Sequence, residues 1–239
     1  MANVVITGAS DGIGRALATI YRKRGATVYA VGRRRFAAIV DAPFAADQYL
    51  QCDLSDGHAP QLIAAWLAKH GVTRLDVLIH NAGLGAYGPP AEADPAVTRA
   101  VVAVNLRAPI ALTHVLLPQI LSARGTIVCI SSVAAALSTP HYAVYSATKS
   151  ALEGFARSLR VELGNRARVL VVRPGATRTE FHVRSGVPAG RMAVRRFPAP
   201  MRVARGISAA IDRGKPLSTV GTLNRVVAWA GRRMRWLIG

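Results

Sequence analysis

Short apolar runs rich in β-branched residues alternate along the chain with longer segments in which apolar residues recur at helical spacing. This alternation is typical of βαβ units, in which parallel strands form a sheet that helices cover on both faces. Strands are predicted at 3–7, 27–31, 48–52, 75–80, 126–131, 168–173 and 217–220, and helices at 13–24, 58–69, 95–122 and 144–163. We therefore expect an α/β fold with a doubly wound parallel sheet of about seven strands, which binds ligands beyond the carboxyl ends of those strands.

The length and composition suit a single α/β domain, since the chain has 239 residues and 51% of them are hydrophobic. The chain begins directly on a strand-like run, so we expect no secretory leader and a cytoplasmic protein. A spanning helix is not expected, because every long apolar window contains an arginine. Cys52 and Cys129 lie near the ends of predicted strands and lack metal-ligand spacing, which predicts reduced core cysteines and no metal site.

The net charge of +19 is concentrated near the carboxyl end of the chain. Residues 184–239 contain 12 of the 31 Lys and Arg residues but a single acidic residue, Asp212. Basic surfaces of this kind can bind nucleic acid or an anionic membrane. Residues 223–238 interleave apolar residues with arginine, which fits an amphipathic helix lying on a membrane, docked on another subunit, or packed on its own domain with arginines in water. The pattern alone does not choose among these.

A glycine-rich segment, Thr7-Gly8-Ala9-Ser10-Asp11-Gly12-Ile13-Gly14, joins the first predicted strand to the first helix. Gly8 permits a tight turn, Gly12 lets backbone approach a pyrophosphate, and Gly14 lets helix and strand pack closely. The following helix N-terminus directs free N–H groups at the phosphates. Glycine also gathers in loops for turn geometry alone, but its position between strand and helix favours dinucleotide binding.

The end of the second predicted strand indicates which dinucleotide is bound. Gly32 and Arg33 stand where an NAD enzyme usually has an acid for the ribose 2′-hydroxyl, and Arg34 and Arg35 follow. Gly32 leaves room for a 2′-phosphate, and the arginines can neutralise it. We therefore expect NADP(H) rather than NAD(H). The alternative is that the arginines form a solvated surface turn.

Further segments complete a recognisable set of motifs. They are Asn81-Ala82-Gly83, Asn105 within Val104-Asn105-Leu106, Ser132 thirteen residues before Tyr145, Tyr145-Ser146-Ala147-Thr148-Lys149, and Pro174-Gly175 followed by Thr179. Together with the glycine segment they resemble the short-chain dehydrogenase/reductase family over residues 3–182. The resemblance implies a Rossmann-fold oxidoreductase acting on CH–OH groups. We expect a dinucleotide-binding and catalytic core at 1–183, with a substrate lid and basic helical extension of the same domain at 184–239, and a homodimer or homotetramer.

The chemistry expected of these residues is hydride transfer between nicotinamide and a carbonyl or alcohol. Tyr145 would exchange the proton, and Lys149, one helical turn away, would lower the phenol pKa electrostatically. Ser132 would hold the substrate oxygen while charge develops on it. The resemblance implies that Asn105 anchors a water-mediated proton path to Lys149, that Lys149 also binds the nicotinamide ribose, that Asp53 contacts the adenine and that Thr179 binds the carboxamide. The expected cofactor contacts are Gly8, Ser10, Asp11, Gly12, Ile13, Gly14, Arg33, Arg34, Asp53, Leu54, Asn81, Ala82, Gly83, Tyr145, Lys149, Pro174, Gly175, Thr177 and Thr179.

Each of these residues also has a plainer structural role. Ser132 could cap a turn, Asn105 could hold a helix bend, and Asp53 could cap a helix. Two features depart from the family pattern: the stretch 33–48 contains Pro43 and is short for a second helix, and His80 occupies a position where the family often has Asn. We expect a truncated helix in the first case and a packed, non-catalytic histidine in the second.

Substrate walls are predicted from 84–87, 133–142 and 181–200, with Tyr87, His141, Tyr142 and Phe181 as contacts. Leu137, Val187, Met192 and Phe197 add to a mostly apolar lining that suits a hydrophobic carbonyl compound, although these residues could equally pack the loops. Glycines and a proline in the last wall predict a mobile lid. The competing hypothesis is a non-catalytic Rossmann module that acts through its basic surface on nucleic acid or an anionic membrane.

Overall fold

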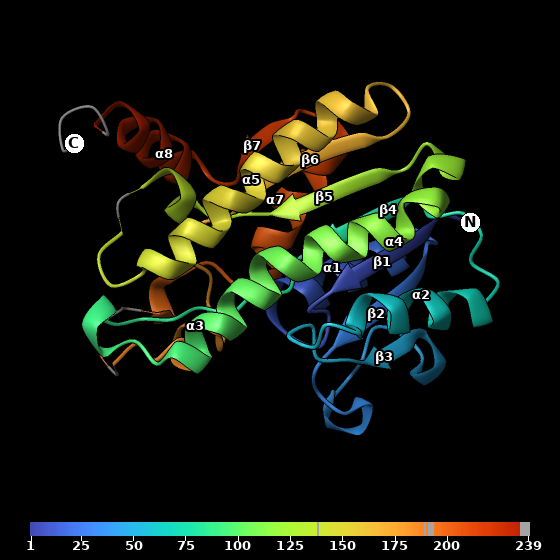
Figure 1. The fold of residues 1–239 in the computed structure, drawn as a ribbon, viewed down its shortest axis with the longest axis horizontal. Coiled ribbons are helices and arrows are strands. Elements are labelled where there is room, and N and C mark those ends of the chain that lie inside the picture. The colour runs from blue at the N-terminus through green and yellow to red at the C-terminus, as the bar shows by residue number, and fades with distance from the viewer. Residues whose placement is uncertain (138, 189, 191–193, 235–239) are drawn as a thin grey trace.

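The computed structural model is a seven-stranded parallel sheet with helices on both faces (Figure 1), and it describes residues 1–234 except 138, 189 and 191–193. The strands are β1 (Asn3–Thr7), β2 (Thr27–Gly32), β3 (Tyr49–Gln51), β4 (Val77–His80), β5 (Thr126–Ile130), β6 (Arg168–Arg173) and β7 (Leu217–Thr219). They lie in the order β3-β2-β1-β4-β5-β6-β7. The predicted fold is confirmed, and the strand order reverses between β1 and β4.

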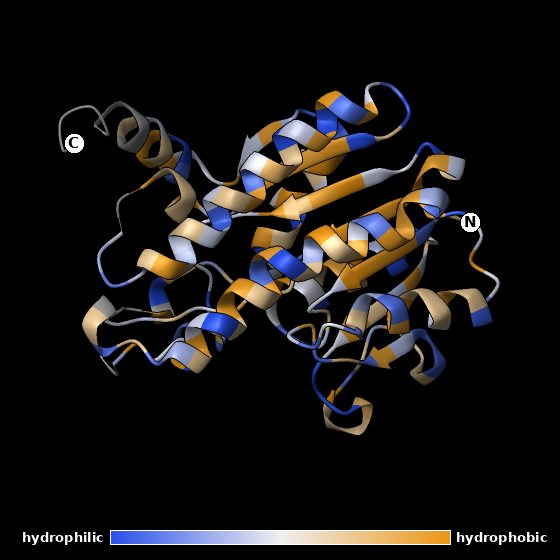
Figure 2. Cartoon of the chain, in the orientation of Figure 1, coloured by the Kyte–Doolittle hydropathy of each residue, from blue (hydrophilic) through white to orange (hydrophobic). Residues whose placement is uncertain are grey.

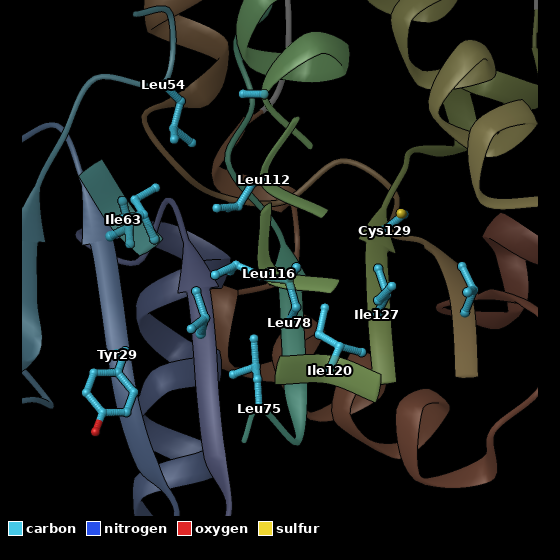
Figure 3. Packing of buried hydrophobic residues seen from close by; sticks show 14 of the residues in the cluster. Tyr29, Leu54, Ile63, Leu75, Leu78, Leu112, Leu116, Ile120, Ile127 and Cys129 are labelled. Atoms are coloured by element: carbon cyan, nitrogen blue, oxygen red, sulfur yellow. The ribbon is translucent and has the colours of Figure 1, made fainter. Parts of the chain in front are cut away.

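The helices form two layers around this sheet. They are α1 (Gly12–Lys23), α2 (Ala59–Lys69), α3 (Pro95–Val102), α4 (Ala108–Ala123), α5 (Ala143–Leu163), α6 (Phe181–Arg184), α7 (Pro200–Arg213) and α8 (Thr222–Met234). Buried residues of α2, α4 and α5 pack with Val5 and Leu78 on one face (Figure 3), and those of α1 and α7 pack with Val4 and Ile79 on the other. Successive strand residues thus alternate between two cores. Because both faces are covered, the central strands are mostly hydrophobic (Figure 2).

Two of the predicted elements need adjustment, and one predicted irregularity is confirmed. The helix expected at 95–122 is interrupted by a π-helical turn, Ala103–Arg107, between α3 and α4. The strand expected at 75–80 starts at Val77, because the Leu75 N–H bonds to the Gln119 carbonyl at the end of α4. The stretch 33–48 contains only two short 3-10 turns, Phe36–Ala38 and Ala46–Gln48, which confirms the truncated helix.

The run Pro95–Ala123 has the length and hydropathy of a membrane-spanning helix. In the structure it lies against the sheet, where Leu112, Leu116 and Ile120 are fully buried. It is therefore a core helix of the α/β fold. Cys52 and Cys129 are also buried and unpaired, as predicted.

Candidate active site

A cleft of about 450 Å³ lies at the carboxyl ends of the strands, over the point where the strand order reverses. It is lined by the loops that follow β1, β2, β3, β4, β5 and β6 and by the first turns of α5. The arrow of β5 points towards this side of the molecule, on which α3 and α8 also lie (Figure 1). The fold thus brings six separate loops to one place.

The loop between β1 and α1 favours glycine at three positions, two because of the backbone conformation and one because of close packing. Gly8 and Gly12 have φ values of +68° and +53°, in the left-handed region. A Cβ on Gly14 would lie 2.2 Å from the Gly8 carbonyl oxygen. Asp11 caps α1 by accepting a 2.7 Å hydrogen bond from the Gly12 N–H. The next N–H groups of the helix are left for a ligand.

The loop after β4 is bonded to this glycine loop. The Asn81 Nδ2 donates to the carbonyls of Thr7 and Gly8, at 2.9 and 3.2 Å. In return the Thr7 hydroxyl accepts from the N–H groups of Asn81 and Ala82, both at 3.1 Å. Asn81 therefore holds the loop after β4 against the glycine loop, because its side chain bonds to the backbone of that loop.

The end of β2 combines a steric limit with a cationic side chain at the cleft. A Cβ on Gly32 would lie 2.7 Å from the Tyr49 hydroxyl, so a side chain there would have to displace it. Arg33 is exposed and lines the cleft beside Asp53. Burial raises the pKa of Asp53, but hydrogen bonds from Ser55 and the charge of Arg33 outweigh it, so the net shift is downward.

Arg34 does not line the cleft, whereas Arg184, far from it in the sequence, does. The Arg34 guanidinium pairs with the Asp11 carboxylate at 3.1 Å, and Arg34 is not among the cleft-lining residues. Arg184 from α6 pairs with the same carboxylate at 2.8 Å and does line the cleft. Asp11 thus ties the segment after β6 to the glycine loop.

The structure brings Ser132, Tyr145 and Lys149 into the same cleft. Ser132 is the second residue after β5, while Tyr145 and Lys149 lie one turn apart on α5. The Lys149 Nζ is 5.8 Å from the centre of the Tyr145 ring and donates a 2.9 Å hydrogen bond to the Ile130 carbonyl. Ser132 also accepts from the Ala134 N–H at 3.1 Å, so it caps the following turn as well.

Burial sets the protonation of both titratable groups. It raises the pKa of Tyr145 to about 12, although the Ser132 hydroxyl lowers it in part. Burial also lowers the pKa of Lys149 to about 8, against the partial opposing effects of Cys129 and Glu153. The net shift of the Tyr145 pKa is therefore upward because desolvation dominates, and the lowering of this pKa by Lys149 stays a prediction.

Asn105 lies behind the cleft, in the π-helical turn, and is fully buried. Its Oδ1 accepts from the Leu84 N–H and its Nδ2 donates to the Leu84 carbonyl, both at 2.8 Å, and Nδ2 also lies 3.1 Å from the Thr148 hydroxyl. A Cβ on Gly83 would meet both Asn105 Oδ1 and Lys149 Nζ, at 3.4 and 3.5 Å. Only glycine at residue 83 therefore leaves the space between these two side chains open.

Comparison with known proteins agrees with this geometry. The family model described as short chain dehydrogenase matches residues 2–186. The protein belongs to the short-chain dehydrogenase family. The "uncharacterized oxidoreductase YciK" of Escherichia coli (strain K12) is 37% identical over 186 residues, which cover 74% of this chain and 73% of YciK.

Two solved structures of short-chain dehydrogenase type carry different cofactors. A short-chain dehydrogenase from Sphingobium yanoikuyae in complex with NADPH is 25% identical, with a TM-score of 0.82 over 99% of this chain and 95% of the other. A 4-hydroxyisoleucine dehydrogenase complexed with NADH is also 25% identical, with a TM-score of 0.79 over 92% of this chain and 97% of the other. This short-chain dehydrogenase is therefore an oxidoreductase with nicotinamide-binding relatives, and a non-catalytic module acting on nucleic acid or membrane is not favoured.

The predicted substrate residues of this dehydrogenase form one aromatic cluster, but only part of it reaches the cleft. Tyr142 and Phe181 line the cleft, with ring centres 5.8 and 5.5 Å from that of Tyr145. Tyr87 and His141 pack behind them and do not line it. Leu137 does line the cleft, whereas Val187 and Phe197 do not, and Met192 lies outside the described residues.

The other predicted cofactor residues lie as follows. Ser10, Asp11, Ile13, Leu54, Ala82, Gly83, Pro174, Gly175, Thr177 and Thr179 line the cleft, and Gly14 lies beneath it. His80 is buried and bonded to the Thr113 hydroxyl at 2.8 Å, as expected of a packed histidine. Most of the residues predicted from the sequence of this short-chain dehydrogenase thus lie at one cleft.

Sequence reasoning missed a buried polar network directly behind the catalytic groups. Arg173, at the end of β6, forms an ion pair with Glu153 on α5 in which Nε lies 2.6 Å from Oε1 and Nη2 contacts Oε2. The Ser131 hydroxyl donates to Glu153 Oε1 at 2.6 Å. Two features of the sequence could have indicated this ion pair: an arginine that ends the apolar run Val169–Val172, and a glutamate one turn beyond Lys149.

Proposed function

We propose that this oxidoreductase transfers a hydride between NADP(H) and a hydrophobic carbonyl or alcohol, with Asn105, Ser132, Tyr145 and Lys149 as its catalytic set. The observation that carries the proposal is that Ser132, Tyr145 and Lys149 line the same cleft as the glycine loop. When bound there, the nicotinamide supplies or accepts the hydride.

The protonation of the chain's own groups suits reduction at neutral pH. With a pKa of about 12, the Tyr145 phenol holds its proton and can donate it to the alkoxide that hydride addition leaves. With a pKa of about 8, Lys149 is largely cationic at pH 7 and can stabilise the transient tyrosinate. Ser132 orients the substrate oxygen. Asn105, across the gap at Gly83, anchors a water-mediated path that returns a proton through Lys149.

NADP(H) is the cofactor that the end of β2 favours. Gly32 lacks the acidic side chain that would bind a ribose 2′-hydroxyl, and Arg33 at the cleft supplies a charge for a 2′-phosphate. Gly8, Gly12 and Gly14 leave space for the pyrophosphate at the start of α1. The aromatic wall of Tyr142 and Phe181 supports a hydrophobic substrate.

The decisive experiment measures NADPH oxidation with a panel of hydrophobic ketones, aldehydes and quinones. Tyr145→Phe should lose at least about 100-fold in kcat while NADPH still binds, because only the exchangeable proton is removed. Tyr21→Phe on α1, outside the cleft, serves as the matched control and should keep full activity. Undiminished turnover of Tyr145→Phe would remove Tyr145 from the mechanism.

We also propose that the protein is cytoplasmic and contacts an anionic membrane through its carboxyl-terminal helix α8. Ala228 of α8 is buried and Asn224 packs against Gly175, so this helix sits on its own domain. Its outer side exposes Leu223, Val226 and Trp229 within a segment rich in arginine. Leu223→Ser/Val226→Ser should reduce co-sedimentation with anionic vesicles, and unchanged binding would exclude this contact.

A homodimer or homotetramer is proposed for the same protein. Val97 and Val102 on α3, Ile110 on α4 and Val161 on α5 are exposed apolar side chains on helices that share one face of the sheet. Light scattering of the wild type and of Val161→Lys tests this, since a lysine at that exposed position should weaken such an interface. A monomeric wild type would contradict it.

A further inference from the structure

A second cavity, of about 440 Å³, lies beside the carboxyl-terminal half of α5. Its described lining consists of Ala135, Ala136, Ser150, Glu153, Arg157, Arg160, Val171, Arg173, Pro216 and Leu217. We name it the α5–β7 cavity. It shares no described lining residue with the catalytic cleft, so it is a separate site.

The charges around the α5–β7 cavity do not balance. Its described lining contains three guanidinium groups, on Arg157, Arg160 and Arg173, and a single carboxylate, on Glu153. Glu153 already accepts from Arg173 and from the Ser131 hydroxyl. Two positive charges are therefore left without a counter-ion among the described lining residues.

The arginines have donor capacity that the protein itself does not use. Arg173 is only 5% exposed, and its Nη1 is buried with no hydrogen-bond partner among the described residues. Arg160 is held in place by bonds to the carbonyls of Val169 and Pro216, at 2.8 and 2.9 Å, which leave its charge uncompensated. Burial lowers the pKa of Arg160, and the charge of Arg157 lowers it further, which marks mutual repulsion between the two. A bound anion would relieve both features.

The rest of the α5–β7 cavity is apolar. Ala135, Ala136, Val171, Pro216 and Leu217 form that part of the lining, and Leu217 is a partly exposed side chain on the edge strand β7. A volume of about 440 Å³ also exceeds the space that an inorganic oxyanion alone needs. The cavity therefore suits a ligand with a dianionic head and a compact apolar group.

We propose that the α5–β7 cavity binds a small organic phosphate monoester, with the phosphate among Arg157, Arg160 and Arg173 and the organic part against the apolar wall. A phosphate monoester dianion matches the two unneutralised charges, and guanidinium forks bind phosphate oxygens in pairs. The assignment is independent of the hydride-transfer chemistry in the catalytic cleft.

Isothermal titration calorimetry with phenyl phosphate and with inorganic phosphate, at constant ionic strength, tests the site. Arg157→Gln should weaken phenyl phosphate binding by about tenfold or more, because it removes an exposed guanidinium that forms no hydrogen bond or ion pair with the described residues. Phenyl phosphate should also bind more tightly than inorganic phosphate, because only the ester reaches the apolar wall.

Two arginine controls separate this site from other phosphate binding. Arg202→Gln, on α7 at the opposite face of the sheet, should leave binding unchanged and so exclude a general charge effect. Arg33→Gln should also leave it unchanged, because Arg33 lines the catalytic cleft. Wild-type affinity in Arg157→Gln, loss of binding in Arg33→Gln, or equal affinity for both probes would each overturn the proposal.

Discussion

The glycine-loop half of the cleft and its catalytic half are built by different means. In the glycine-loop half, the backbone shapes the site: Gly8 and Gly12 have positive φ, and Gly14 has no space for a Cβ atom. In the catalytic half, side chains on the helix α5 form the site, and a buried ion pair supports them from behind. An added atom should therefore damage the first half, whereas a changed charge should damage the second.

The largest effect is expected from removing the charge behind the catalytic half. The side chains of Glu153 and Arg173 are 12% and 7% exposed, so Glu153→Gln leaves a buried guanidinium without its counter-charge. Such a change destabilises a protein by about 3–5 kcal/mol. Denaturant unfolding measures it, and Glu162→Gln at an exposed position of the same helix should change stability little. A Glu153→Gln protein as stable as Glu162→Gln would show that the ion pair does not support this half.

In the glycine-loop half, adding one methyl group should be enough to destabilise the fold. Gly14→Ala places a Cβ within 2.2 Å of the Gly8 carbonyl oxygen and 2.4 Å of Asn81 Nδ2, neither of which can yield freely. We expect a loss of about 3 kcal/mol in stability, typical of severe overpacking, with weaker NADPH binding. Gly57→Ala, at a position with open space around it, is the control for thermal unfolding. An unaffected Gly14→Ala protein would contradict the backbone argument.

His80 gives a pH-dependent test of the catalytic half. Its pKa is lowered to about 3, mainly by burial and further by the charge of Lys149 in that half. The unfolded chain binds this proton near pH 6.5 and the folded chain only near pH 3, so stability falls as the pH drops through that window. The loss from His80 between pH 7 and pH 5 is about 2 kcal/mol.

Unfolding of wild type and His80→Gln at pH 7 and pH 5 measures this contribution. The variant should lose less stability on acidification than the wild type, and His58→Gln, at an exposed histidine, should behave like the wild type. Equal acid sensitivity of His80→Gln and wild type would show that His80 is not held neutral.

The smallest expected effect concerns cofactor preference. Arg33→Ala removes an exposed charge at the cleft and should weaken NADPH binding by about tenfold while NADH binding stays the same. Arg35→Ala, exposed and outside the cleft lining, is the control in fluorescence titrations. If Arg33→Ala changes neither affinity, Arg33 does not select the cofactor.

Much of the cleft follows from local sequence signals. The apolar runs predicted all seven strands to within two residues at either end, and Pro43 correctly indicated that the second helix is truncated. The π-helical turn at Asn105 was not predicted, because its apolar spacing differs from that of an α-helix by a single residue. Nor does any local pattern show that Arg34 pairs with Asp11, 23 residues away, and does not itself line the cleft.

By itself, the sequence determined the order of the strands, the main helices as far as β6, the glycine turn, and the placing of Tyr145 and Lys149 one turn apart, because these depend on residues close together in the chain. The helix α7, between β6 and β7, was not predicted. Only the tertiary structure decided the direction of the Tyr145 pKa shift, the ion pair of Arg173 with Glu153 and the arginine-lined α5–β7 cavity. Those features arise from burial and from contacts between residues distant in sequence, and both exist only once the sheet has assembled.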